Sequence, residues 1–235
     1  MLLFLAEFAG AAESICPRAT LRRVIARAHN MGFDPYAALE YEFFMFNETP
    51  ESVRAKGYKN LQPMTPGWFG YSMLRNSVRA EFYHQILELC ESMDFPLEGL
   101  HTETGPGVLE AAIAVDSADN AGDKAALFKT FIKVLAQRHD MMATFMAKWS
   151  PDLPGSSGHL HQSLWDAGNQ INLFAAAGRS TLACFPAHSY LLYRTDSRLR
   201  DKCLKIVEQT KNPEDADKIC NLSGTAILNS KNGPL

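Results

Sequence analysis

Leu39-Glu40-Tyr41-Glu42-Phe43-Phe44-Met45-Phe46 is the stretch of sequence that decides the fold. It is aromatic and apolar with few turn formers, which predicts a β-strand. Side chains alternate between the two faces of a strand, so Glu40 and Glu42 should share one face, roughly 6–7 Å apart. Two such acids repel each other unless a cation neutralises them, and hard divalent cations bind through oxygen. A strand with one wet face also carries Glu-x-Glu, so this pattern leaves both interpretations open.

A second pair of acids lies in His101-Thr102-Glu103-Thr104-Gly105-Pro106-Gly107-Val108-Leu109-Glu110. Thr-Gly-Pro-Gly is typical of a tight turn, because glycine permits unusual φ angles and proline fixes its own. Ala111–Val115 follows as a predicted strand. Glu103 and Glu110 should then lie on either side of the turn, where they could converge. A hairpin with two surface acids would show the same pattern.

A glycine-serine turn leads into two histidines in Pro154-Gly155-Ser156-Ser157-Gly158-His159-Leu160-His161-Gln162-Ser163-Leu164. On a strand both imidazoles share a face, again because of the period of two. A neutral imidazole is a good metal ligand and a good partner for phosphate. Two surface histidines after a loop are the alternative. One more acid, Glu98, lies in Phe95–Leu100, just before the Glu103 turn.

Taken together and in this order, these four motifs resemble the catalytic domain of the glutamine synthetase family, most closely its branch that joins glutamate to amines. The resemblance runs from about Cys16 to about Phe174 and includes the helix-like Asp123–Lys129 and the approach Ala143–Lys148. It implies an α+β fold, in which an antiparallel sheet packs with helices as part of the catalytic domain. The expected organisation is a short leader (1–15), the partial catalytic domain (16–174) and an unassigned helical tail (175–235).

The resemblance implies two divalent cations, Mg²⁺ or Mn²⁺. Glu42, Glu103 and Glu110 match the family's ligands for one cation. Glu40 and His159 match ligands for the second, which sits nearer the nucleotide phosphates. Two cations would neutralise the triphosphate and the charge that develops during transfer.

The resemblance also implies ATP as co-substrate. Glu98, His161 and Ser163 match positions that contact ATP, and Gly155 matches a backbone site that touches glutamate. The family forms γ-glutamyl phosphate from ATP and glutamate, and ammonia or an amine then displaces phosphate. No residue of this sequence is assigned as a catalytic acid or base.

The sequence departs from the family pattern in three places. About fifteen residues precede the matching region, where the family has a small domain that completes a neighbouring subunit's site. No segment after Phe174 resembles the arginine-bearing segments that hold the glutamate carboxylate and the phosphates, or the last ligand of the second cation. The tail does not resemble the family, and it predicts helices over Ser197–Thr210 and from Asn212. We therefore expect the family's reaction, with feeble or no turnover from this chain alone. Members of the family are homo-oligomers, and the short leader leaves assembly of this chain open.

Composition excludes several other classes of function. The 235 residues carry a net charge of −3, which does not favour binding to nucleic acid or anionic membranes. The apolar opening Met1–Ala6 is interrupted by Glu7 and has no basic leader, so it does not predict a signal peptide. No apolar run reaches transmembrane length. The five scattered cysteines suit reduced thiols, which favours a cytoplasmic location.

Three helices are expected from apolar residues at helical spacing, over residues 18–31, 77–93 and 119–139. Their inward-facing stripes are predicted as Leu21, Val24, Ile25 and Ala28; Val78, Phe82, Ile86, Leu89 and Met93; and Leu127, Phe131 and Leu135.

Three functions follow from these observations. The first is an ATP-dependent ligase that acts on glutamate. The second is a catalytically inactive family relative with a structural or scaffolding role. The third is an unrelated two-metal hydrolase built on the same acids and histidines.

Overall fold

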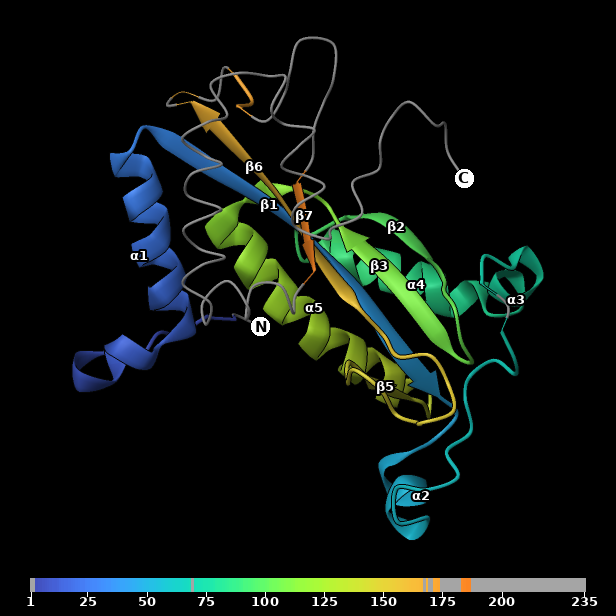
Figure 1. Cartoon of the computed structure of the whole chain (residues 1–235). Coiled ribbons are helices and arrows are strands. Elements are labelled where there is room, and N and C mark those ends of the chain that lie inside the picture. Colours follow the sequence, from blue (N-terminus) through green and yellow to red (C-terminus); the bar gives the residue numbers. More distant parts are fainter. Residues whose placement is uncertain (1–2, 69, 167, 169–170, 174–182, 187–235) are drawn as a thin grey trace.

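The long central strand β1 (Phe33–Phe46) organises the whole fold and contains the acidic stretch of the sequence. The computed structural model describes residues 3–68, 70–166, 168, 171–173 and 183–186. In these residues β1 runs diagonally through the sheet and has neighbours on both edges (Figure 1). Every other strand except β2 and β7 pairs with it directly.

The sheet is antiparallel throughout, in the order β2-β3-β1-β6-β7. The short strands β4 and β5 pair with β1 on either side of the segment that pairs with β3. Antiparallel neighbours place residues directly opposite one another, so the register decides which side chains meet. The remaining strands are β2 (Leu97–Thr102), β3 (Val108–Ile113), β4 (Asp116–Ser117), β5 (Met142–Thr144), β6 (Gly158–Asp166) and β7 (Ala183–Pro186).

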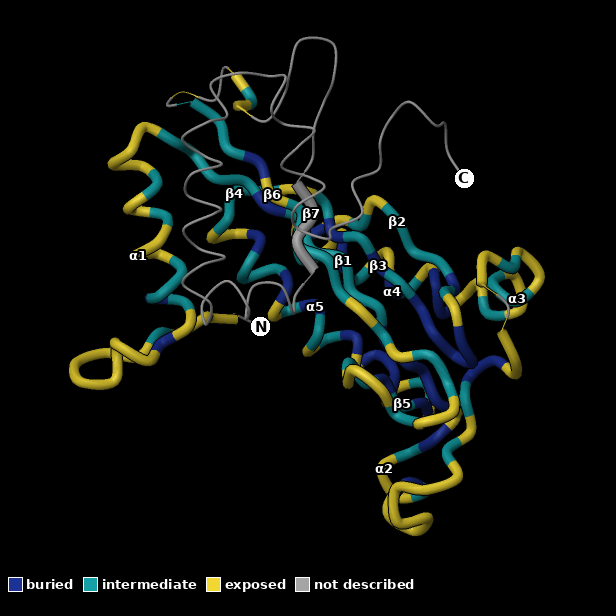
Figure 2. Tube along the Cα trace, viewed as in Figure 1, coloured by how far each residue is buried: buried dark blue, intermediate teal, exposed yellow. Residues whose placement is uncertain are grey.

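Helices α4 (Ala80–Ser92) and α5 (Ala118–Arg138) bury the apolar face of the sheet, and α1 (Pro17–Asn30) lies beside α5 (Figure 1). The buried residues concentrate between these two helices and the strands (Figure 2). The α+β prediction, with helices packed on an antiparallel sheet, is therefore confirmed. The core includes Phe43, Met45 and Leu109 from strands and Phe82, Ile86, Phe128 and Ile132 from helices. The smaller helices are the 3₁₀ helix η1 (Gly10–Ile15), α2 (Pro50–Ala55) and α3 (Met73–Val78).

The helix predicted over residues 77–93 is wrong at its start. The chain forms two helices, α3 and α4, separated at Arg79, whose backbone leaves the helical region (φ −119°, ψ 28°). Val78 belongs to α3, before this break, and is 76% exposed instead of buried. Phe82 and Ile86, which follow the break, are buried as predicted.

Two other predicted apolar stripes differ in detail. Val24 of α1 is 58% exposed, because α1 lies at the margin of the molecule and buries only Ala19 fully. In α5 the core stripe runs through Phe128 and Ile132, while Leu127 and Phe131 are only partly buried; Leu135 is buried as predicted. Both α5 stripes have helical spacing, and the packing against β1 selects the one that lies one residue later.

One acid outside the predicted site is buried. Glu48 is 2% exposed and lies just after β1. Its carboxylate accepts hydrogen bonds from Lys56 Nζ at 2.6 Å and from the backbone N of Gln62 at 2.8 Å, and it also contacts Ser52. These bonds, with the Lys56 ion pair as the largest cause, lower the pKa of Glu48 to about 2. The carboxylate thereby ties the loop around α2 to the end of β1.

The helices predicted over Ser197–Thr210 and from Asn212 lie outside the described residues. Within the same tail, Ala183–Pro186 forms strand β7, which extends the sheet along β6. No helix in the described part of the chain is long and apolar enough to cross a membrane.

Candidate metal and nucleotide site

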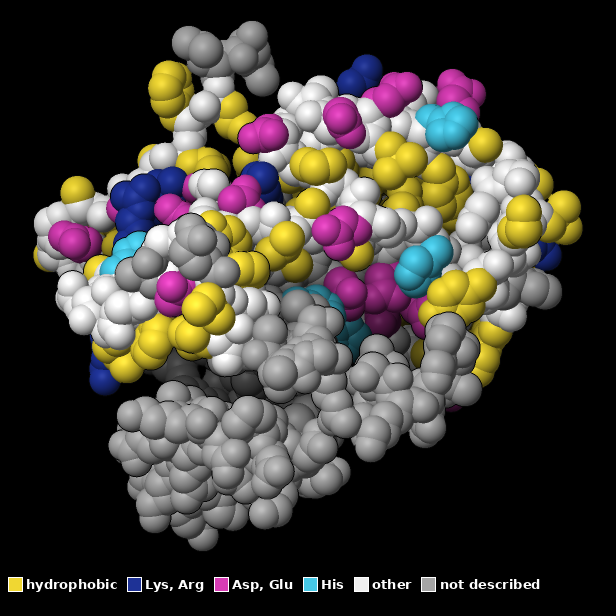
Figure 3. Space-filling view, turned by 90° about the horizontal axis from the view of Figure 1, so that it is seen from above, with side chains coloured by type: hydrophobic (Ala, Val, Ile, Leu, Met, Phe, Trp, Pro, Cys, Tyr) yellow, Lys and Arg dark blue, Asp and Glu magenta, His cyan; other side chains and the backbone are white. Residues whose placement is uncertain are grey.

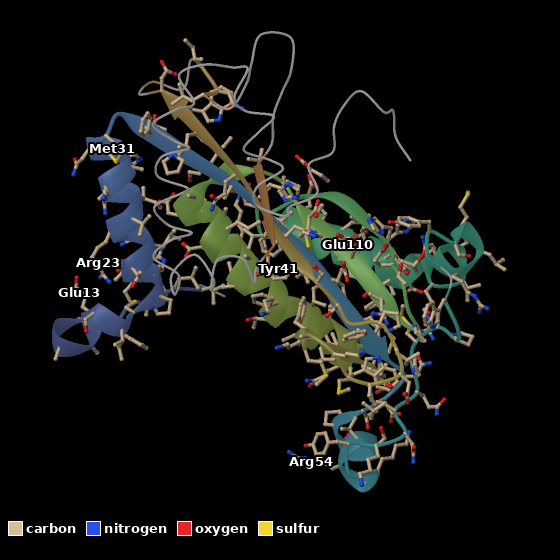
Figure 4. All side chains as sticks on the ribbon, in the orientation of Figure 1. Glu13, Arg23, Met31, Tyr41, Arg54 and Glu110 are labelled. Carbon is tan, nitrogen blue, oxygen red and sulfur yellow. The ribbon has the colours of Figure 1, made fainter. Side chains whose placement is uncertain are left out.

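The register of three neighbouring strands brings together acids and a histidine that lie far apart in the sequence. Glu42 of β1 pairs with Glu110 of β3, and Glu40 of β1 pairs with His159 of β6. Residues directly opposite on antiparallel strands have Cβ atoms roughly 4.5–5.5 Å apart. β1 therefore carries the centre of the site, with β3 on one side and β6 on the other (Glu110 is labelled in Figure 4).

The first group of side chains comprises Glu40, Glu110 and His159, whose ligating atoms lie within 4.8 Å of one another. His159 Nδ1 is 3.1 Å from Glu40 Oε2, and His161 Nε2 is 3.0 Å from Glu40 Oε1. The close contact with His161 and the charge of both imidazoles, when they are protonated, lower the pKa of Glu40 despite partial burial. The same contact raises the pKa of His161. A protonated His161 would thus offset part of the negative charge on this side of the site.

The second group comprises His101, Glu103 and Glu110, again with ligating atoms within 4.8 Å. The turn between β2 and β3 closes as predicted, because Glu103 N donates to Val108 O at 3.0 Å. His101 lies opposite Glu110 in the β2–β3 register. His101 was not among the predicted site residues, although it precedes Glu103 by two positions, the spacing that puts two side chains on one strand face.

Glu110 belongs to both groups and is the most strongly crowded acid. Burial, and then the neighbouring carboxylates Glu42, Glu40 and Glu103, raise the pKa of Glu110, and His101 partly offsets this. Glu103 Oε2 is buried and makes no hydrogen bond to any described residue. A concentration of carboxylate oxygens with two imidazoles in reach is a donor set that fits divalent cations. Figure 3 shows acidic and histidine side chains gathered in a hollow of this face.

Glu42 occupies a different position from the other four predicted ligands. Its Oε2 accepts a hydrogen bond from Ser157 N at 2.9 Å, and its backbone N donates to Ser157 O at 3.1 Å. The glycine-serine loop is therefore fastened to β1 beside the site. Glu42 lies in neither compact group, but its pairing with Glu110 keeps it at their edge.

A cavity of about 530 Å³ lies next to Glu40. The three residues predicted to contact ATP, Glu98, His161 and Ser163, all line it. Tyr36 and Trp165 form an aromatic end, with ring centroids 6.2 Å apart in an edge-to-face arrangement. Ligand sites of drug size or larger commonly have roughly 300–1,000 Å³, so the cavity is large enough for such a molecule.

Comparison with known proteins decides the family. Residues 14–188 match the family model of the glutamine synthetase catalytic domain. This chain belongs to the glutamine synthetase family. Among curated family members, it is 46% identical over 175 residues to type-1 glutamine synthetase 2 of Dictyostelium discoideum, covering 73% of this chain and 33% of that protein. It is 37% identical over 159 residues to glutamate–isopropylamine ligase of a Pseudomonas species, covering 67% and 35%.

A solved structure agrees with the fold. The GmaS/ADP complex superposes with a TM-score of 0.61 at 26% identity, covering 70% of this chain and 36% of that one. The chain thus spans about a third of the length of the relatives it matches. The family match reaches residue 188, beyond Phe174, and so includes β7. Because the chain belongs to this family, the third function considered from the sequence, an unrelated two-metal hydrolase, is excluded.

Gly155 has a packing reason to be glycine within the family fold. A Cβ at this position would lie 2.7 Å from the backbone O of Ala147, so no larger residue fits without movement of the backbone. Ser156 N also donates to Ala147 O at 2.8 Å. The contact of Gly155 with glutamate stays a prediction, since this packing explains the glycine by itself.

Proposed function

We propose that this chain carries the cation- and nucleotide-binding part of an active site that joins glutamate to ammonia or an amine. The reaction would proceed through γ-glutamyl phosphate, with ATP as phosphoryl donor. The supporting observation is the convergence of Glu40, Glu103, Glu110 and His159 beside a cavity lined by the residues predicted to bind ATP. Membership of the glutamine synthetase family supplies the reaction class.

Five side chains would hold two Mg²⁺ or Mn²⁺ ions. Glu42, Glu103 and Glu110 would bind one, and Glu40 and His159 the other. Bound cations would offset the phosphate charge and stabilise the transfer of the γ-phosphoryl group. Glu40, Glu42 and Glu110 hold their relative positions because they belong to paired strands, and Glu103 is held in the adjoining turn by its backbone hydrogen bond to Val108. Such rigid support is what phosphoryl transfer requires.

The cavity would hold the nucleotide. Tyr36 and Trp165 offer aromatic surface for the base, and Trp165 Nε1 donates to Ser163 Oγ at 3.1 Å, which orients that hydroxyl. Glu40 and His161, which contact each other, also line the cavity, and Glu40 belongs to the cation site. The triphosphate would therefore extend from the aromatic end toward the cations.

The acceptor would be ammonia or a small amine. The relatives differ in this respect: one is named a glutamine synthetase and another a glutamate–isopropylamine ligase. The metal and nucleotide residues are common to either acceptor, so they support the ligase class and not one amine.

The proposal predicts that the 235-residue chain binds Mg-ATP weakly. Calorimetric titration with millimolar Mg-ATP should give a saturable heat, and His161→Phe should remove it because the cavity loses its imidazole. His84→Asn, an exposed histidine on α4, is the matched control and should bind like the unmodified chain. Absence of heat with the unmodified chain, or equal heat with His161→Phe, would contradict the proposed nucleotide site.

Turnover by this chain alone is expected to be slow. No segment of the sequence resembles the family's arginine-bearing segments, whose planar guanidinium groups grip phosphate and carboxylate in a bidentate way. Loss of one charge-stabilising group typically costs about 10²–10³ in rate. Phosphate release would be followed with ATP, Mg²⁺, glutamate and either ammonia or isopropylamine. A glutamate-dependent rate on the order of 1 s⁻¹ or above, as in ordinary enzymes, would overturn the expectation of impaired turnover.

A further inference from the structure

We propose that His101 is a ligand of the cation assigned above to Glu42, Glu103 and Glu110, and that it binds through Nε2. The inference rests on the proposed cation site and adds a nitrogen donor to a set that otherwise consists of carboxylates. It also predicts which metal the site prefers.

The distances around His101 suit shared coordination better than hydrogen bonding. His101 Nε2 is 3.6 Å from Glu110 Oε2, and Nδ1 is 4.0 Å from Glu103 Oε2. Neither separation is short enough for a hydrogen bond. Two ligands in adjacent positions on one ion, each roughly 2.0–2.3 Å from it, are about 3–3.6 Å apart. The Nε2–Oε2 separation falls at the upper end of that range.

The surroundings of Nδ1 determine which ring nitrogen of His101 is free to bind a cation. His101 Nδ1 lies 3.3 Å from the backbone O of Thr102, which can accept a hydrogen bond but cannot donate one. A proton on Nδ1 leaves the lone pair on Nε2, the atom that faces Glu110. A backbone carbonyl that fixes the tautomer in this way is the usual support of a metal-binding histidine.

The ring of His101 is also held in place. It packs on the Tyr71 ring, with centroids 5.0 Å apart and an interplanar angle of 33°. Tyr71 N in turn donates to Thr102 O at 3.0 Å, so the same carbonyl anchors both residues. The His101 side chain is 35% exposed, which leaves an entry path for an ion from solvent.

A nitrogen donor changes the metal preference of the site. Mg²⁺ prefers oxygen ligands and gives up its waters reluctantly, whereas imidazole binds transition metals well. The site that includes His101 should therefore bind Mn²⁺ more tightly than Mg²⁺. Without its imidazole the site would be an all-oxygen set, and the difference between the two metals should shrink.

Replacement of the ring nitrogens tests the assignment. His101→Phe keeps a ring that can pack on Tyr71 but removes both nitrogens, and His101→Gln supplies a second variant in case the first misfolds. Both should weaken Mn²⁺ binding by about 10–100-fold, and Mg²⁺ binding by clearly less, when each metal is titrated by calorimetry. His84→Asn is the control and should change neither affinity.

Pulsed electron paramagnetic resonance of bound Mn²⁺ gives a readout independent of affinity. A background with His159→Asn and His161→Phe removes both imidazoles beside the other cation. Nitrogen coupling from imidazole should persist in that background and disappear when His101→Phe is added. Persistence after that addition, or unchanged Mn²⁺ affinity in both His101 variants, would overturn the role of His101 alone. Failure of the unmodified chain to bind Mn²⁺ at millimolar concentration would overturn the proposed cation site and, with it, this ligand.

Discussion

At the scale of single residues, Glu40 and Glu110 are two acids of one site with opposite electrostatic surroundings. Glu40 contacts two imidazoles, and its pKa is lowered. Glu110 is partly buried and is crowded by three carboxylates, and its burial first, then these charges, raise its pKa. A raised pKa means that the ionised form of Glu110 is disfavoured in the folded protein. A neutral residue at this position should therefore stabilise the folded protein when no metal is bound.

Glutamine substitutions at these two positions should therefore change stability in opposite directions. In the metal-free protein at pH 7, Glu110→Gln should raise the free energy of unfolding by roughly 0.5–1 kcal/mol, the range of partly exposed charge interactions, and Glu40→Gln should lower it by a similar amount. Both should weaken Mn²⁺ binding. Urea unfolding in the presence of a chelator measures the first effect. A destabilising Glu110→Gln would show that the acids are not in repulsion.

At the scale of elements, the β2–β3 turn depends on Gly107. This residue has φ of +70°, and a Cβ there would lie 2.4 Å from Met45 O and 3.1 Å from Met64 N. Met45 N donates to Gly107 O at 2.8 Å, so the turn packs directly on β1. The position of the turn relative to β1 therefore determines how close Glu103 and Glu110 come to Glu42.

Gly107→Ala should destabilise the protein by more than about 2 kcal/mol, since the left-handed backbone costs roughly 1–2 kcal/mol and the clash with β1 adds to it. Gly57→Ala is the matched control, because Gly57 has φ of +58° but nothing within 4 Å of its Cβ position. It should show the conformational cost alone. Thermal unfolding of both variants measures the difference, and equal losses would mean that the contact with β1 is loose.

At the scale of the whole molecule, the cations should bridge strands from distant parts of the chain and so stabilise the fold. A ligand that binds only the folded state at 100 times its Kd contributes about 2.7 kcal/mol. For a chain of this size each kcal/mol raises Tm by roughly 2–4 °C.

Millimolar MnCl₂ should raise Tm by several degrees, and a chelator should reverse the change. NaCl at matched ionic strength controls for screening of the acids. The shift should be smaller in Glu110→Gln, which lacks the carboxylate common to both groups. If NaCl produced the same rise in Tm as MnCl₂, general screening and not a specific site would explain the stabilisation.

Local patterns in the sequence predicted the parts of the site that depend on strand alternation. The shared face of Glu40 and Glu42 and the turn between Glu103 and Glu110 follow from spacing and turn chemistry. His101 was missed although it has the same spacing of two from Glu103, and its position opposite Glu110 is set by the β2–β3 register. The burial of Glu48 depends on how the loop around α2 folds over its carboxylate, which no periodic pattern in the sequence indicates. In α5 two stripes had equal spacing, and only the packing on β1 distinguishes Phe128 from Leu127.

The pairing of β6 with β1 has a consequence for the order of events during synthesis. Glu40 and His159 share a hydrogen bond across 119 positions of sequence. A growing chain on the ribosome therefore presents the acids of β1 and β3 well before the histidines of β6 exist to accompany them. Contacts this remote form late, because the intervening loop must first be closed. Until then the nascent sheet is an acidic surface with an open edge at β1.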